Sequence, residues 1–382
     1  MNLKEYFTDT NYVVIYTYSF FSKFANSLVK FFTGAYFLSL GMPLSVVLLF
    51  FALEYGIKGL FAPFGPKFAS SLGVIKAMVI SNVSLIFFFI LMNFSKDYLY
   101  IGFFAFIFHA FYSGISVTVQ EGLQSKVIKN KNRGRQLSLS FVIQSLAALL
   151  AVYFGTIALQ NFSYLLIVIV GGISISLSTA SFLFLKNIQF NSRLGYAQIF
   201  RQLRSKAYKK NYFPMFGQTL ALIANTVFLP IFIYLSVGNF KTYGTIIFVA
   251  LLVEIFMTLI FGRLIDRLGA RSMNIKTAGL NSLGNIGLMV FQYNQLTLLF
   301  ANIFNQISWN LYFNNALVRQ FNKAKRYSFT FMTLIKMNIC FVGALVLGLF
   351  ALISVFIGEN ISFIIFFSAM VGMYIFSKYF KD

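Results

Sequence analysis

The chain consists almost entirely of long apolar runs separated by short polar breaks, and this spacing restricts the fold more than any other feature. A helix that crosses the hydrocarbon core of a bilayer needs about 20 apolar residues. Twelve runs approach or reach that length, at residues 11–38, 43–64, 73–92, 98–119, 137–158, 164–185, 213–237, 243–261, 273–293, 296–313, 329–353 and 361–376. Only 10% of the residues are charged, whereas about 25% is usual for a soluble protein. We therefore predict an all-α integral membrane protein with twelve transmembrane helices.

The basic residues are distributed unevenly between alternate connections. If the N-terminus is placed inside, 25 of the 31 lysines and arginines fall in inside loops and termini, and four fall within spans. The remaining two, Lys96 and Lys241, fall outside. Because cytoplasmic loops of membrane proteins are rich in Lys and Arg, we expect both termini to be cytoplasmic and the protein to lie in the cell (inner) membrane. The net charge of +22 then reflects topology, and we expect no nucleic acid partner.

The N-terminus lacks the features of a cleaved leader. It has no basic n-region, and no small-residue cleavage site follows a short apolar core. The first apolar run is therefore expected to remain as a helix.

The longest predicted inside connection divides the chain into two halves. A six-helix bundle is expected over residues 1–186 and another over 213–382, with a basic cytoplasmic linker at 187–212. Within the linker, QIFRQLRSKAYKK (198–210) is expected to form an amphipathic helix on the anionic inner leaflet. Connections of this kind join the halves of transporters that are built from repeats.

The sequence lacks the residue sets that enzymes and metalloproteins use. A single cysteine, Cys340, excludes an internal disulfide, and a single histidine, His109, excludes a multi-histidine metal centre. We find no phosphate-binding loop, no Ser-His-Asp set and no carboxylate pair suited to glycosyl transfer. We therefore expect neither enzymatic activity nor a cofactor or metal.

The loop after the eighth run carries the clearest motif. Residues 262–271 read GRLIDRLGAR and resemble the signature loop of the major facilitator superfamily, G-x-L-x-D-R-x-G-[RK]-[RK]. The key positions are held by Gly262, Asp266, Arg267, Gly269 and Arg271. The resemblance implies that these residues form a gating loop. It also implies a pseudo-symmetric six-plus-six bundle in which spans 1, 4, 7 and 10 line a central cavity.

The resemblance is weaker in the first half. The matching stretch, APFGPKFASSLGVIK (62–76), places Ser70 where Asp266 stands in the second half. Residues 132–138, NRGRQLS, resemble the family's loop between spans four and five, but the glycine- and proline-rich signature of antiporters is missing from span five. The missing signature counts against a drug/proton antiporter. Because the first loop lacks the acidic residue, a member of the fold that does not transport, such as a lipid scramblase or a scaffold, is kept as the alternative to a transporter.

Polar residues on spans 1, 4, 7 and 10 form the candidate substrate cavity. Lys23, Asn26 and Lys30 are spaced by three and four residues, so they share one helix face, where two cations would attract an anionic solute. Alternatively, these lysines extend to the interface or pair with carboxylates on other helices. The other candidates are His109, Gln218, Asn225, Asn305, Gln306, Trp309 and Asn310. The set favours a cavity that hydrogen-bonds a solute, although each amide alone also fits bonding between helices.

Four further charged residues are candidates for charge pairing or proton coupling. Glu54 and Lys58 have the i,i+4 spacing of a helical salt bridge, and Lys336 is an alternative partner for Glu54. Glu254 lies twelve residues before Asp266, which at about 1.5 Å per residue is about 18 Å into the membrane. Glu254 is expected to be protonated or paired across the bundle, and it is our first candidate for a proton carrier. His109, which titrates near neutral pH, is another.

Together these features predict a monomeric secondary active transporter of a small organic solute that works by alternating access, with proton coupling as an option. Lys23 and Lys30 favour an anionic or zwitterionic solute. The sequence leaves open the identity of the solute, the direction of transport and the coupling ion.

Overall fold

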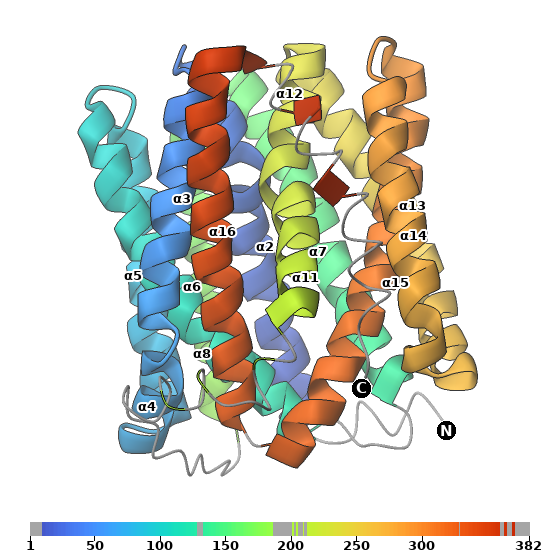
Figure 1. The fold of residues 1–382 in the computed structure, drawn as a ribbon. Helices are drawn as coiled ribbons and strands as arrows, with labels where there is room; N and C mark the ends of the chain where they lie inside the picture. The colour runs from blue at the N-terminus through green and yellow to red at the C-terminus, as the bar shows by residue number, and fades with distance from the viewer. Residues whose placement is uncertain are drawn as a thin grey trace.

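The computed structural model describes residues 10–127, 133–185, 201, 204, 209, 212–327, 329–359, 363–364 and 369–370. Every regular element in these ranges is helical, and the long helices stand side by side along one axis (Figure 1). In the first half they are α2(Thr10–Ser39), α3(Leu44–Phe61), α4(Phe64–Ser71), α5(Val74–Phe94), α6(Leu99–Val127), α7(Arg133–Asn161), α8(Tyr164–Ser181) and the short η2(Phe182–Phe184). In the second half they are α11(Tyr212–Ile223), η3(Ala224–Phe228), α12(Leu229–Val237), α13(Phe240–Leu268), α14(Ala270–Val290), α15(Gln295–Tyr327) and α16(Phe329–Ile357).

The helices agree with a chain that crosses a membrane many times. Among the described residues, eight helices are long and apolar enough to span a bilayer. The first, ninth and tenth predicted spans correspond to α2, α14 and α15, which are helical but more polar. The predicted twelfth span, 361–376, and the linker, 187–212, lie almost entirely outside the described residues.

Two helix pairs join the halves along their length. α3 packs along α16, and α7 packs along α13. Glycines allow the close approach: a Cβ atom at Gly343 would lie 2.6 Å from the ring of Tyr55, and one at Gly244 would overlap Thr156. Small residues serve the same purpose in other membrane helix pairs, since they let the backbones come together.

The two ends of the bundle differ in charge. We call the end that holds the N-terminal end of α2 and the turn between α13 and α14 the basic end. Gly73 and Gly269 form the turns there, with φ of 87° and 78°, a backbone region that glycine adopts without steric cost. The exposed basic side chains at this end include Lys67, Lys76, Arg263 and Arg267, whereas Lys96 and Lys241 are exposed at the opposite end.

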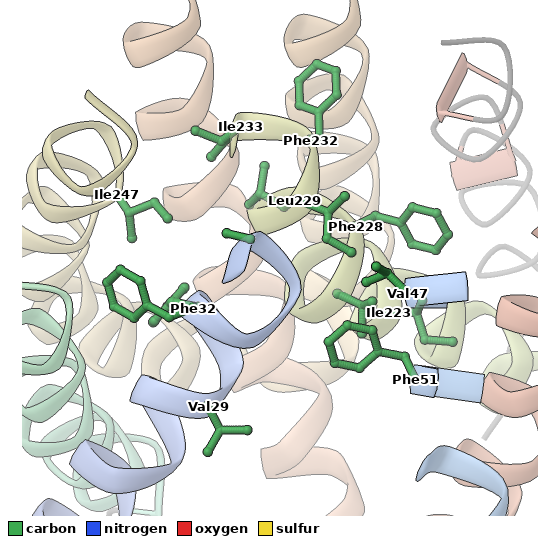
Figure 2. Close-up of a cluster of buried hydrophobic side chains, with 14 of the residues drawn as sticks. Val29, Phe32, Val47, Phe51, Ile223, Phe228, Leu229, Phe232, Ile233 and Ile247 are labelled. Atoms are coloured by element: carbon green, nitrogen blue, oxygen red, sulfur yellow. The ribbon is translucent and has the colours of Figure 1, made fainter. Parts of the chain in front are cut away.

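A cluster of buried apolar side chains, which we call the apolar plug, lies in the part of the bundle farther from the basic end, and Figure 2 shows its side chains. It is formed by Val29, Phe32, Val47 and Phe51 of the first half and by Ile223, Phe228, Leu229, Phe232, Ile233 and Ile247 of the second. The side chain of Ile231 lies 3.0 Å from the position of a Cβ on Gly34, and the Tyr243 hydroxyl donates a hydrogen bond to the carbonyl of Phe31. The two halves are therefore in direct contact at this level.

The seventh predicted span contains a π-helical turn near its middle. Pro230 at the start of α12 has no N–H, so it cannot bond to the carbonyl of Thr226 one turn earlier. The preceding residues form the wider turn η3, which is π-helical. Turns of this kind are frequent at functional sites, and Thr226 and Val227 of η3 line the cavity described next.

Candidate functional site

A cavity of about 330 Å³ lies between the two halves. It is lined by α2, α3, α6 and α7 from the first half and by α11, η3, α13, α15 and α16 from the second. It extends from Phe51 of the apolar plug and the neighbouring Phe31 to Gln124, Leu137 and Leu317 toward the basic end. The cavity therefore lies on the basic side of the plug.

Lys23, Asn26 and Lys30 of α2 all line this cavity, in agreement with the shared helix face that their spacing predicted. Lys23 and Lys30 both interact electrostatically with Glu254 of α13, which belongs to the other half. The ammonium of Lys30 also lies 4.7 Å from the centre of the Phe31 ring. Two lysines of one half thus interact with a single carboxylate of the other.

Glu254 is held by hydrogen bonds from both halves. Its Oε1 accepts one from the hydroxyl of Ser145 on α7, at 2.9 Å, and one from the amide of Asn310 on α15, at 2.6 Å. The oxygen of Asn310 in turn accepts bonds from Thr258, at 3.1 Å, and Asn314, at 2.6 Å. Glu254 is only 7% exposed. The network therefore holds its carboxylate in a buried position at the boundary between the halves.

Glu54 pairs with His109, and this corrects the expected local pair with Lys58. Nδ1 of His109 lies 2.8 Å from Oε1 of Glu54, and Nε2 lies 3.2 Å from the oxygen of Asn26. The imidazole of α6 therefore bridges α3 and α2. The ammonium of Lys58 lies 5.3 Å from the centre of the Tyr55 ring. The packing of α6 on α3 brings an N–H donor to the buried carboxylate, so Glu54 does not depend on its own helix.

Lys336 also has a different partner from the one expected. Its ammonium lies 2.6 Å from Oε1 of Glu121, whereas the sequence suggested Glu54. The pair joins α6 of the first half to α16 of the second, and both residues line the cavity. Sequence reasoning did not single out Glu121. The available signal was that the chain has only nine acidic residues and that this one follows the fourth predicted span by two positions.

The polar stripe of α15 divides between the cavity and neighbouring helices. Gln306, Trp309 and Asn310 line the cavity. Asn305 instead donates a hydrogen bond to Asn225, at 2.8 Å, so neither of these two predicted cavity residues faces the solute space. Gln218 likewise accepts a bond from Gln320, at 2.6 Å. For these three residues the alternative reading, bonding between helices, agrees with the structure.

Aromatic rings from both halves form one wall of the cavity. The rings of Trp309 and Phe313 on α15 lie 5.2 Å apart at an interplanar angle of 31°. Phe141 of α7 meets Phe313 edge-on at 5.8 Å. All three residues line the cavity. Sequence reasoning identified only Trp309, because one phenylalanine among 51 gives no signal of its position.

The predicted gating loop lies at the basic end. Gly269 forms the turn between α13 and α14, and Arg267 is exposed in the last turn of α13. The side chains of Asp266 and Arg271, and the surroundings of Gly262, lie outside the described residues. The gating role of the loop stays a prediction.

Comparison with known families identifies the chain. The sequence model of the Major Facilitator Superfamily matches residues 15–334. The chain belongs to the major facilitator superfamily. This confirms the resemblance found at residues 262–271, and membership supports a role in membrane transport rather than enzymatic catalysis. A search of curated proteins found no match.

A solved structure of this superfamily has the same fold. The crystal structure of the human organic anion transporter MFSD10 (TETRAN) matches with a TM-score of 0.72 and 11% sequence identity, over 96% of this chain and 99% of that one. At this level of identity the likeness establishes the major facilitator fold and leaves the substrate to be argued from the cavity.

Proposed function

We propose that this protein is a secondary active transporter that carries a small organic anion across the membrane. The observation that carries the proposal is the pairing of Lys23 and Lys30 on one wall of a cavity formed by both halves. Buried lysines in a membrane protein are costly unless they meet negative charge, and Glu254 supplies only one carboxylate for the two. An anionic solute balances the remaining charge. The similarity to a human organic anion transporter supports the same solute class.

Alternating access of the central site is the proposed mechanism. Twelve spans in two six-helix halves, 1–186 and 213–382, would rock about the α3–α16 and α7–α13 contacts. With the basic end in the cytoplasm, as the excess of Lys and Arg favours, the plug closes the external side and the cavity lies on the cytoplasmic side of it.

Proton coupling through Glu254 is the proposed source of energy. Glu254 interacts electrostatically with both lysines. An anion that binds Lys23 and Lys30 competes with Glu254 for their positive charge, which disfavours the ionised form of the buried carboxylate. Uptake of one proton by Glu254 together with a monoanion leaves the net charge of the site as it was before binding, so proton and anion would cross together.

Uptake into proteoliposomes tests the proposal. A panel of labelled monocarboxylates and dicarboxylates is presented with an imposed pH gradient. We expect one class to accumulate, and accumulation to be lost in Lys23→Gln and Lys30→Gln. Glu254→Gln should still exchange labelled for unlabelled anion but no longer accumulate it against its gradient. Lys67→Gln, at an exposed position of α4, is the matched control.

Two outcomes would contradict the proposal. Movement of labelled lipid without anion uptake would identify a scramblase instead. Normal gradient-driven accumulation by Glu254→Gln would remove Glu254 from the coupling mechanism and leave the anion site intact.

A further inference from the structure

The cavity has two chemically different walls. One wall is formed by α2 and carries Lys23, Asn26 and Lys30, with Ser19 and Ser22 one turn closer to the basic end. The other wall carries aromatic rings from α7 and α15. A solute that fills the space must contact both walls, so charge alone does not describe what the site selects.

The aromatic wall is continuous across the boundary between the halves. Phe141 comes from the first half, and Trp309 and Phe313 come from the second. The indole is 8% exposed and faces the cavity beside Gln306 and Asn310. Aromatic rings prefer offset stacked or edge-to-face partners, and such pairs contribute beyond the apolar area they bury. Because Phe141, Phe313 and Trp309 all line the cavity, a planar ring in the solute would find aromatic partners in this wall.

We propose that the transported anion carries an aromatic ring, with its acidic group at Lys23 and Lys30 and its ring against Trp309, Phe313 and Phe141. This inference rests on the proposed function and adds the solute class. The volume agrees with it, because an apolar cavity of about 150 Å³ accepts benzene. A cavity of about 330 Å³ holds one or two rings together with a carboxylate.

The chain provides its own reporter for this test. Trp309 is the only tryptophan among 382 residues, so the intrinsic tryptophan fluorescence of the protein originates entirely from the cavity wall. Full-length protein in lipid nanodiscs is titrated with benzoate, cyclohexanecarboxylate, acetate and the neutral analogue benzamide. Benzoate and cyclohexanecarboxylate have the same number of heavy atoms and the same charge, and they differ in the planarity and aromaticity of the ring.

We expect benzoate to change the fluorescence saturably and to bind more tightly than cyclohexanecarboxylate. A ring pair worth about 0.5–1.5 kcal/mol corresponds to about a two- to twelvefold difference in affinity. Acetate and benzamide should bind more weakly than benzoate. Calorimetry on Trp309→Leu and Phe313→Leu should show benzoate reduced to the affinity of cyclohexanecarboxylate, whereas Trp309→Phe should retain the preference. Phe104→Leu, at a lipid-exposed position of α6, is the matched control.

The two proposals fail in different ways. Equal affinity for benzoate and cyclohexanecarboxylate, or an unchanged preference in Trp309→Leu, would overturn the aromatic solute and leave the anion transporter standing. Binding of benzamide as tight as that of benzoate, with no loss in Lys23→Gln or Lys30→Gln, would overturn the anion site itself.

Discussion

At the scale of single residues, buried charges determine which side chains depend on one another. Glu54 and His109 expose only 4% and 8% of their side chains. Removing one member of such a pair leaves the other without its partner, which costs about 3 kcal/mol or more, whereas replacing both by apolar groups is often tolerated. We expect His109→Phe to lower the melting temperature of the purified protein by several degrees, and the further change Glu54→Leu to recover part of the loss.

The control for these two variants is a substitution that removes a charge from an exposed position. Lys96→Gln, at an exposed position in the connection between α5 and α6, should melt like the original protein. A double variant that melts no higher than His109→Phe would show that the Glu54 carboxylate is not the group left unpaired.

The ion pair of Glu121 and Lys336 leads to a prediction about conformation. It joins the halves at 2.6 Å and must break when α6 and α16 separate, so its loss should lower the population of the present conformation. Each 1.4 kcal/mol changes a population ratio about tenfold. Distances between spin labels at Lys67 and Arg263, both exposed at the basic end, should broaden or shift in Lys336→Gln.

A charge-reversed double variant provides the control. Glu121→Lys combined with Lys336→Glu keeps an opposite-charge pair at the same place and should restore the distance distribution. An unchanged distribution in Lys336→Gln would show that the pair does not hold the two halves in this arrangement.

These pairs show which contacts can be predicted from the sequence and which cannot. The spacing of Lys23, Asn26 and Lys30 placed them correctly on one face, because a single helix fixes that relation. The partner of Glu54 is 55 positions away and depends on how α6 packs against α3. The sequence suggested Lys58 on the same helix and Lys336 as partners of Glu54, whereas tertiary packing supplied His109.

At the scale of helices, the first eleven apolar runs each coincide with a helix, and the helix at 213–237 contains a π-helical turn. The length of each apolar run predicted these helices, because a segment that crosses lipid must form its backbone hydrogen bonds within itself. The rotation of a helix about its axis was less predictable. The polar residues of α15 were expected to face the cavity together, yet Asn305 bonds to Asn225, because polar groups occupy more than one face of α15.

The contact between α7 and α13 gives the prediction at this scale. Gly244 of α13 lies directly against Thr156 of α7, near the plugged end. A leucine there cannot fit while the halves are in contact, and overpacking of this kind costs about 1–3 kcal/mol. We expect Gly244→Leu to remain folded but to lose most uptake in proteoliposomes, because the plug-closed conformation is disfavoured.

Gly172→Leu is the matched control, since no atom lies within 4 Å of a Cβ at Gly172 in α8. Uptake by Gly244→Leu equal to that of Gly172→Leu would show that close contact of α7 and α13 is not required during transport.

At the scale of the whole molecule, sequence and structure contribute different information. The uneven charge predicts which end faces the cytoplasm, and the loop at 262–271 predicted the family before any contact was known. Neither predicted where the apolar plug lies. The packing around Gly34 and Tyr243 that forms the plug joins residues that are far apart in the sequence. The aromatic wall was equally hidden, because its rings come from runs of similar apolar composition.

The sidedness of the bundle is testable in intact cells. Cys340 is the single cysteine of the sequence and is buried. In a Cys340→Ser variant, labelling by a thiol reagent therefore comes only from cysteines that are introduced by mutation. The excess of Lys and Arg at the basic end should hold that end in the cytoplasm, since translocating these charges is unfavourable. Cysteines placed at Lys96 or Lys241 should therefore react with a membrane-impermeant maleimide added outside. Cysteines at Lys67 or Arg267 should react only after permeabilisation. Labelling of Lys67→Cys in intact cells would reverse the topology, and the plug would then face the cytoplasm and the cavity the exterior.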